Sequence, residues 1–312
     1  MPAVDVRDLS HAFGEQVALR EVDFRVEEGE LFGVIGPDGA GKTTLFRVLT
    51  TLLVPQRGSA EVLGRDTVAD FRQLRREIGY MPGEFSLYAD LTVRENLDFF
   101  ATIFGTTVEE NYGLVEEIYV QLEPFARRRA GKLSGGMKQK LALCCALIHA
   151  PGILFLDEPT TGVDAVSRVE FWDMLGRLRE RGITIVVSTP YMDEASRCQR
   201  VGLMQGGRLL RVDTPEGVRA GYGHPLYRVT ARERYRLLQL LRGRRDTLRA
   251  DPFGEHVHLT TEHPISPPAL ADLGDELREA GLTDVEAVPA DPTIEDVFLD
   301  LLAREDAPEP VG

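Results

Sequence analysis

Cysteine is scarce in this chain of 312 residues, which contains only Cys144, Cys145 and Cys198. The first two are adjacent within an apolar segment of helical spacing, and the three have no metal-ligand spacing. These features exclude a small secreted domain held together by disulfides. A reduced, cytoplasmic interior is the expected environment.

Positive charge is also under-represented. Lysine and arginine total 36 against 50 aspartate and glutamate residues, which gives a net charge of -14. Because so acidic a surface repels a phosphate backbone, we expect no nucleic acid partner. The chain lacks a basic cluster that would hold it on anionic lipid, so we expect any membrane attachment to go through protein contacts.

Long apolar runs are missing as well. No segment approaches the roughly 18 consecutive apolar residues that span a bilayer, and the start, MPAVDVRDLS, has neither a positive nor an apolar signal region. Hydrophobic residues nevertheless make up 43% of the chain, enough for a sizeable core. If this protein moves a solute, we expect another polypeptide to form the path.

The apolar pattern indicates two folded regions. In the first, strands are predicted at residues 4–26 with a turn at Gly14, and at 31–35, 153–156 and 183–187. Helical spacing covers 93–147 and 167–179, and this alternation predicts a parallel sheet with helices on both faces. In the second, strands are predicted at 226–230 and 256–260, and helices at 268–280 and 293–302. We therefore predict an α/β domain at 1–221, an α+β accessory domain at 222–304 and a frayed tail at 305–312.

A glycine-rich loop follows the apolar strand at 31–35. Its residues and the start of the next helix are Gly36, Pro37, Asp38, Gly39, Ala40, Gly41, Lys42, Thr43 and Thr44. The pattern of glycine, four residues, glycine, lysine and threonine is that of a nucleotide phosphate loop. Its backbone amides and the helix N-terminus form a concave site for an anion. We expect Lys42 to reach the β and γ phosphates of ATP and the Thr43 hydroxyl to ligate Mg²⁺.

Two carboxylates come at the end of the apolar strand at 153–156. They are Asp157 and Glu158, and the carboxyl ends of strands are where open α/β sheets bind ligands. We assign Asp157 to Mg²⁺, through a water, and Glu158 to polarising the water that attacks the γ-phosphate. Taken alone, the segment could be an acidic turn after a buried strand.

With the segment LSGGMKQ at residues 133–139, the chain resembles the ABC ATPase family, whose signature this segment matches. The resemblance implies a phosphate-loop NTPase core with an antiparallel β subdomain and a helical signature subdomain. It also implies that Ser134, Gly135 and Gly136 cap the γ-phosphate bound by an opposite subunit, so that two ATP-binding domains enclose two nucleotides. A serine and two glycines at a helix start would otherwise be only a capping device.

Further positions are similar to family motifs. The segment that ends at Asp164 resembles the family's D-loop, which makes contacts across the dimer. Phe13 resembles the aromatic residue that stacks on adenine, although a tyrosine is more usual there. A core phenylalanine is the alternative interpretation of Phe13.

Two positions depart from the family pattern. Gly83 stands where the family has a glutamine that contacts Mg²⁺ and the attacking water, and Pro190 stands where it has a histidine that touches the γ-phosphate. Neither side chain can make these contacts, so turnover is expected to be slow. We do not expect Glu84 to replace the glutamine, because its charge would lie beside the γ-phosphate.

Two more segments point to export. Residues 85–96, FSLYADLTVREN, resemble the region that receives the coupling helix of a membrane subunit, and residues 293–298, TIEDVF, resemble the closing helix of the accessory domain in drug-export ATPases. We therefore expect an ATPase on the inner face of the cell membrane, attached through a separate permease and paired with a second ABC ATPase domain. The alternatives are a catalytically weakened regulatory half of a hetero-pair, and a soluble ABC ATPase without a permease. The sequence does not identify the exported molecule.

Overall fold

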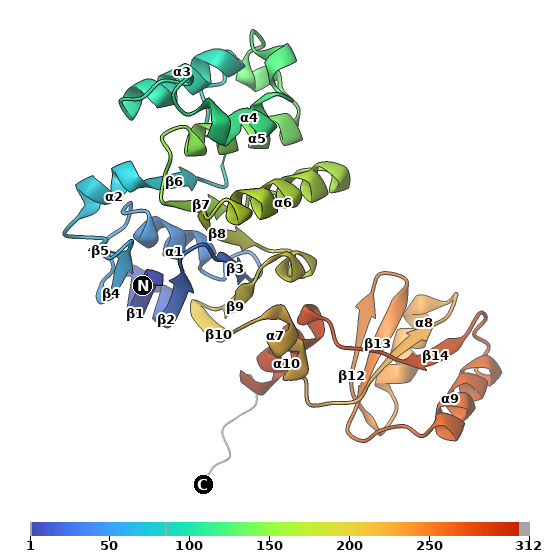
Figure 1. The fold of residues 1–312 in the computed structure, drawn as a ribbon. Helices are drawn as coiled ribbons and strands as arrows, with labels where there is room; N and C mark the ends of the chain where they lie inside the picture. Colours follow the sequence, from blue (N-terminus) through green and yellow to red (C-terminus); the bar gives the residue numbers. More distant parts are fainter. Residues whose placement is uncertain (1, 85, 306–312) are drawn as a thin grey trace. The chain divides into compact units, whose positions relative to one another are not determined.

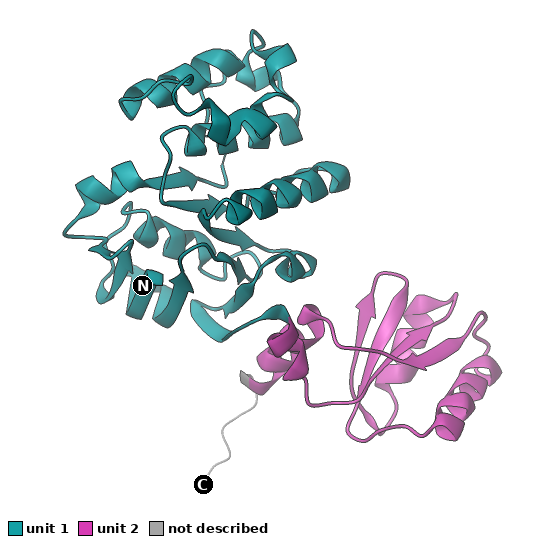
Figure 2. Ribbon diagram, in the orientation of Figure 1, with its two compact units in different colours: residues 1–215 teal, residues 216–312 magenta. Residues whose placement is uncertain are grey.

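The computed structural model describes residues 2–84 and 86–305 and divides the chain into two compact units, residues 1–215 and 216–312 (Figures 1 and 2). The division falls six residues before the boundary that the sequence predicts at Gly221. Of the predicted tail, Glu305 ends the last helix, and 306–312 lie outside the described residues.

A six-stranded sheet forms the centre of the first unit, with the strand order β10-β9-β3-β8-β7-β6. Its strands are β3 (Leu31–Ile35), β6 (Ile78–Met81), β7 (Ile153–Asp157), β8 (Thr184–Thr189), β9 (Arg200–Gln205) and β10 (Arg208–Asp213). Only β10 runs antiparallel to its neighbour. Every residue of β3, β7 and β8 is buried, as expected for parallel strands covered on both faces.

A second sheet of the first unit is antiparallel, in the order β2-β1-β4-β5. Its strands are β1 (Pro2–Phe13), β2 (Gln16–Glu27), β4 (Arg57–Val62) and β5 (Arg65–Asp66). The turn between β1 and β2 contains Gly14 at φ 60°, where glycine has no steric cost.

Helices cover the parallel sheet and build a separate layer at one end of the unit (Figure 1). They are α1 (Lys42–Leu49), α2 (Phe71–Glu77), α3 (Val93–Ile103), α4 (Tyr112–Tyr119), α5 (Gly135–Leu147), α6 (Ala165–Glu180) and the 3-10 helices η1 (Glu123–Phe125), η2 (Ala130–Lys132) and η3 (Met192–Arg197). The layer at the end consists of α3, α4 and α5. These features confirm the predicted α/β class and the helical insertion.

The second unit is an antiparallel α+β structure. Helix α7 (Pro215–Ala220) leads into a sheet of order β12-β13-β11-β14. The remaining elements are β11 (Leu226–Thr230), α8 (Arg234–Arg242), β12 (Thr247–Phe253), β13 (His256–Thr261), α9 (Pro267–Glu279), β14 (Glu286–Pro289) and α10 (Ile294–Glu305). Val257 and Leu259 of β13 pack in one apolar cluster with α8 and α9. Sequence analysis missed β12, β14 and α8.

On the opposite face of that sheet, three polar side chains form a row of contacts. The fully buried Asp296 accepts a hydrogen bond from His258 Nδ1 at 2.8 Å, and His258 Nε2 lies 3.2 Å from His256 Nε2. Burial acts to raise the pKa of Asp296, but hydrogen bonds from His258 and Thr293 outweigh it and hold the pKa below its ordinary value.

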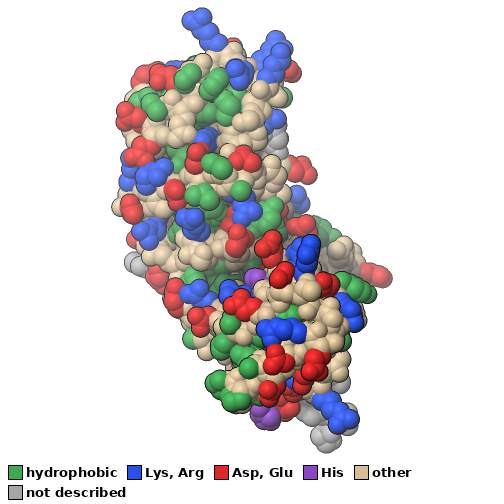
Figure 3. Space-filling view, turned by 90° about the vertical axis from the view of Figure 1, so that its right-hand side faces the viewer, with side chains coloured by type: hydrophobic (Ala, Val, Ile, Leu, Met, Phe, Trp, Pro, Cys, Tyr) green, Lys and Arg blue, Asp and Glu red, His purple; other side chains and the backbone are tan. Residues whose placement is uncertain are grey.

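Two properties of the described surface bear on partners. On the face drawn in Figure 3, acidic and basic side chains are interspersed, and no continuous basic patch is visible among the described residues. Within 2–84 and 86–305, no helix has both the length and the apolar character needed to cross a bilayer.

Candidate nucleotide site

The phosphate loop lies between β3 and α1 and depends on two glycines for close packing. A Cβ on Gly36 would lie 2.1 Å from the Met204 carbonyl oxygen, and one on Gly41 would lie 2.4 Å from the Ala18 carbonyl oxygen. Gly41 also has φ 109° and is the residue that precedes the first turn of α1. A side chain at either position would therefore displace the loop from β2 and β9.

Lys42 points back into this loop and is 2% exposed. Its Nζ donates hydrogen bonds to the carbonyl oxygens of Gly36 and Pro37 at 2.7 and 2.9 Å and lies 3.0 Å from Glu158 Oε1. A buried ammonium group is stable only when charge and hydrogen bonds compensate it. The loop and Glu158 together supply that compensation.

Asp157, the last residue of β7, is held by its neighbours on adjacent elements. Ser188 Oγ of β8 donates to Asp157 Oδ1 at 2.6 Å, and the Thr43 hydroxyl of α1 interacts with the same carboxylate. Burial raises the pKa of Asp157, while the hydrogen bonds from Ser188 and Thr43 oppose that shift. A hydroxyl and a carboxylate in contact are oxygen ligands of the kind that Mg²⁺ takes.

Glu158 has an unusual backbone conformation for a non-glycine residue, with φ 49°. Its amide donates to the carbonyl and hydroxyl oxygens of Ser188, at 3.1 and 2.9 Å. Thr161 closes the following turn, with its amide 3.2 Å from the Glu158 carbonyl oxygen and its hydroxyl 3.3 Å from Glu158 Oε2. Because its side chain is 20% exposed, the carboxylate reaches the solvent-facing edge of the site.

A cavity of about 270 Å³ joins these groups to Phe13. It is lined by Phe13, Gln16, Val17, Ala18, Asp38, Gly39, Gly41, Lys42, Thr43, Thr44 and Glu158. The Phe13 side chain is 49% exposed and makes an edge contact with His11 at 4.7 Å. Phe13 therefore does not belong to the core, and its ring is available to a planar ligand.

The signature segment lies elsewhere. Ser134 precedes α5 and accepts a hydrogen bond from the Met137 amide at 3.4 Å. A Cβ on Gly136 would lie 2.7 Å from Ser167 Oγ of α6, so this glycine permits close packing of the two helices. No residue of the segment is among the described residues that line the phosphate-loop cavity. Gly135 instead lines a separate cavity of about 150 Å³ with Gly83 and Gly162.

Asp164 shapes the loop between β7 and α6. It precedes α6, and its Oδ1 accepts a hydrogen bond from the Ser167 amide at 3.0 Å, which lowers the pKa of the carboxyl group. Asp164 is thus a helix cap in this chain, beside the surface that Gly162 shares with the signature segment.

Comparison with known proteins shows the family of the chain. The family model described as "ABC transporter" matches residues 19–161. The Nod factor export ATP-binding protein I of Rhizobium sp. strain N33 is 35% identical over 308 residues, which cover 97% of this chain and 98% of that protein. The chain belongs to the family of ABC transporter ATP-binding proteins.

Other similarities cover about 70% of this chain. The probable multidrug ABC transporter ATP-binding protein YbhF of Escherichia coli K12 is 42% identical over 220 residues, which are 70% of this chain but only 38% of that protein. A solved ATP-binding subunit of an ABC transporter has a TM-score of 0.64 at 28% identity and covers 70% of this chain and 92% of its own. A dimeric ATP-binding cassette bound to ADP and Pi has a TM-score of 0.61 at 27% identity and covers 68% of this chain and 98% of its own.

The two departures from the ABC pattern follow the two strands that flank β7 in the sheet. Gly83 follows β6, and a Cβ built on it would lie 3.1 Å from the Asp157 carbonyl oxygen. Pro190 directly follows β8. Both positions are therefore adjacent to the segments that carry Asp157 and Glu158.

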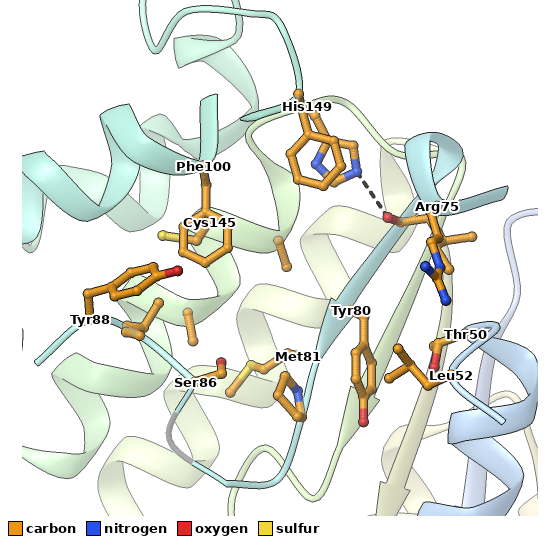
Figure 4. A pocket seen from close by; sticks show the side chains of 16 residues that line it. Thr50, Leu52, Arg75, Tyr80, Met81, Ser86, Tyr88, Phe100, Cys145 and His149 are labelled. Atoms are coloured by element: carbon orange, nitrogen blue, oxygen red, sulfur yellow. Dashed lines mark hydrogen bonds between the residues drawn. The ribbon is translucent and has the colours of Figure 1, made fainter. Parts of the chain in front are cut away.

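An apolar groove of this ABC ATPase lies between the sheet and the helical layer (Figure 4). Its volume is about 450 Å³, and its lining includes Tyr80, Leu87, Tyr88, Phe100 and Phe104. His149 stacks on Phe104 at 3.8 Å and contacts the Ile78 carbonyl oxygen at 3.0 Å. Residues 86–88 of the predicted coupling segment line the groove, while Phe85 lies outside the described residues.

Sequence reasoning missed three residues around the ABC site. Ser188 contacts both Asp157 and Glu158, and Arg168 forms an ion pair with the buried Glu194 at 3.2 Å. The polar residues that end the apolar run of β8 gave a signal for Ser188, since strand ends carry ligands in such sheets. For Arg168 and Glu194 the sequence offered no spacing that would single them out.

Proposed function

We propose that this chain binds and hydrolyses ATP as one half of a pair of ABC ATPase domains, and that hydrolysis powers export through a separate permease. The observation that carries the proposal is the convergence of Lys42, Thr43 and Glu158 on one cavity, with the buried Asp157 hydrogen-bonded to Thr43 behind them. The family membership and the exporter names of the relatives support it.

Nucleotide binding uses the phosphate loop. The loop amides from Gly36 to Gly41 and Lys42 receive the phosphates, Thr44 lies in the first turn of α1, and Phe13 provides a face for adenine. Thr43 and Asp157 would hold Mg²⁺, whose charge offsets that of the phosphates.

Hydrolysis is an in-line attack of water on the γ-phosphorus, in which the bond to the β–γ bridging oxygen breaks and ADP leaves. Glu158 accepts a hydrogen bond from that water and draws its proton away as the new bond to phosphorus forms. Lys42 leaves the Glu158 carboxylate for the phosphate oxygens and offsets the charge that develops there. Freed of this ion pair, Glu158 becomes the stronger proton acceptor at the moment when the substrate is in place.

The site is completed by a second ATP-binding domain. Ser134, Gly135 and Gly136 would face the γ-phosphate of the opposite subunit, because no residue of this segment is among the described residues lining the cavity of its own chain. Asp164 lies at the same junction.

Mixing two defective variants tests this arrangement. Lys42→Ala removes the phosphate contact of one subunit and Ser134→Arg blocks the signature of the other, so a mixed pair retains one intact site. We expect neither variant alone to trap ATP, and the mixture to trap about one nucleotide for two chains. A mixture as inactive as its parts, under conditions in which wild type traps ATP, would contradict the shared site.

The apolar groove is the proposed docking site of the permease. Binding there would place the protein at the inner face of the cell membrane. Its aromatic lining suits an amphipathic helix. We expect Tyr88→Asp to abolish co-purification with the permease while ATP binding stays unchanged. Retained co-purification would exclude the groove as the docking site. A wild-type protein that co-purifies with no membrane protein would favour a soluble ABC ATPase without a permease.

A catalytically weakened half of a hetero-pair is the second candidate, favoured by Gly83 and Pro190. It predicts that purified wild type binds ATP and dimerises poorly with itself, while a partner ATPase with the usual glutamine and histidine restores hydrolysis. Full activity of the chain as a homodimer would exclude this candidate.

A further inference from the structure

Glu194 is a buried carboxylate outside the motifs described above. It lies in η3, is 3% exposed, accepts hydrogen bonds from two threonine side chains and forms an ion pair with Arg168. Thr160 Oγ1 donates to its two oxygens at 2.9 and 3.1 Å, Thr189 Oγ1 donates to Oε2, and Arg168 Nε lies 3.2 Å from Oε1. A carboxylate removed from water needs this compensation.

These partners lie on the segments that form the hydrolysis site. Thr160 follows β7 two residues after Glu158, and Thr189 ends β8 directly before Pro190. The strands are parallel neighbours, with Asp157 paired to Ser188. The buried Glu194 therefore links the ends of β7 and β8 through its hydrogen bonds to Thr160 and Thr189.

The backbone of Glu158 needs such support. A non-glycine residue in the left-handed region is strained, and the conformation persists only where the surroundings fix it. Thr160 lies inside the turn that the Thr161 amide closes on Glu158. Anchoring the Thr160 hydroxyl to Glu194 fixes the middle of that turn.

Arg168 links this cluster to α6. Its guanidinium also lies 2.9 Å from Asp193 and 4.4 Å from the centre of the Tyr191 ring. The first turn of α6 is capped by Asp164 and packs on Gly136 of α5. The ion pair thus connects the helix that touches the signature segment to the turn that carries Glu158.

We propose that Glu194, oriented by Arg168, is a positioning residue for Glu158 in ATP hydrolysis. It acts through the Thr160 hydroxyl and holds the Glu158 carboxylate where it can polarise water. This inference rests on the proposed ATPase function.

The test uses variants of graded severity in the full chain, assayed with its permease or partner ATPase. Thr160→Val removes one hydrogen bond to Glu194 and keeps the shape of the side chain. Glu194→Gln removes the charge that meets Arg168. Arg197→Gln is the matched control. The Arg197–Asp173 ion pair at 3.1 Å also connects η3 to α6, but within the described residues neither side chain bonds to Thr160 or Thr189.

For Thr160→Val we expect kcat to fall about fivefold or more, the equivalent of one lost hydrogen bond, while the affinity for Mg²⁺-ATP and the melting temperature stay near wild type. Glu194→Gln should lower kcat at least as much, and combining the two should cost less than their separate effects multiplied. Arg197→Gln should hydrolyse ATP as wild type does. If Glu194→Gln does not fold, Thr160→Val decides.

Two outcomes overturn the inference. One is a Thr160→Val variant with wild-type kcat. The other is an equal loss of kcat in Arg197→Gln, because any ion pair between α6 and η3 would then affect hydrolysis in the same way. Absence of hydrolysis by the wild type, with every partner tried, would instead count against the proposed function itself.

Discussion

Lys42 and Glu158 form an ion pair across the nucleotide site, with Nζ 3.0 Å from Oε1. The ammonium group that we expect to meet the β and γ phosphates is thus already held by a carboxylate and by the carbonyl oxygens of Gly36 and Pro37. Binding of ATP has to exchange that carboxylate for phosphate oxygens. The pair therefore links nucleotide binding to the release of Glu158.

Replacing Lys42 with alanine should weaken Mg²⁺-ATP binding by a factor on the order of 100, because a charge-assisted contact to the phosphates is lost. The measurement is equilibrium titration with a fluorescent ATP analogue. Lys140→Ala is the matched control, since Lys140 is bonded to Gln121 and Glu170 away from the cavity. Wild-type affinity in Lys42→Ala would refute the phosphate-loop assignment.

The Glu158→Gln variant should lose hydrolysis by roughly 100-fold or more, since the amide cannot take the proton of the attacking water. Its affinity for ATP should equal or exceed that of wild type, because a neutral amide competes less for Lys42. ATP should therefore accumulate in a dimer, detectable by size-exclusion chromatography with light scattering. Adding Ser134→Ala should weaken that dimer. An ATP-bound variant that stays monomeric with every partner would argue against the shared site.

Restoring the family residues tests whether the site is weakened. The backbone φ of Gly83 is not in the left-handed region that favours glycine. A Cβ at this position would lie 3.1 Å from the Asp157 carbonyl oxygen, so a glutamine there requires only a small shift of the loop. Gly83→Gln with Pro190→His should raise kcat by about tenfold, with a smaller gain from each change alone. Affinity has to be measured in parallel. Unchanged affinity without a faster rate would favour a mechanism that no longer uses these contacts.

Two adjacent glycines of the signature segment should respond differently to a methyl group. Gly136→Ala places Cβ against Ser167 of α6 and should lower the free energy of unfolding by about 1–3 kcal/mol. Gly135→Ala meets only the Gly162 carbonyl oxygen at 3.5 Å, an ordinary contact, and should leave stability near wild type. Ser167→Gly should restore part of the loss in Gly136→Ala. Urea unfolding monitored by circular dichroism makes the comparison, and equal losses for both glycines would contradict it.

The second unit should lose stability on acidification through His256. Burial, together with the neighbouring His258 and Arg228, lowers the pKa of His256 below its ordinary value of 6.5, although Asp296 opposes this shift. Since the folded pKa lies below the unfolded one, the contribution of neutral His256 is present above pH 6.5 and is lost as pH falls through the folded value.

The comparison is the melting temperature at about pH 7.5 and about pH 5.5. His256→Gln should show a smaller drop than wild type, because it cannot gain the proton. His263→Gln, at an exposed position, should behave as wild type. An unchanged drop in His256→Gln would refute the role of this imidazole.

The sequence by itself determined those functional segments that consist of consecutive residues. The loop from Gly36 to Thr44 and the pair Asp157–Glu158 each follow an apolar strand, so their place at a sheet edge could be predicted from local pattern alone. The second unit was harder. Strand β12 alternates polar and apolar residues from Thr247 to Asp251, but Pro252 argues against a strand there, and β14 has only four residues.

Only the tertiary structure decided which distant groups meet. Ser188 reaches Asp157 from 31 residues away, and Glu194 reaches Thr160 from 34 residues away. These contacts depend on the order β3-β8-β7, which brings strands far apart in the chain side by side. A side chain that bonds to a distant segment leaves no periodic pattern in the sequence around it, because strand order and helix packing determine which residue it meets. For that reason the roles of Arg168 and Glu194, and the contacts that Ser188 makes, became visible only in the folded protein.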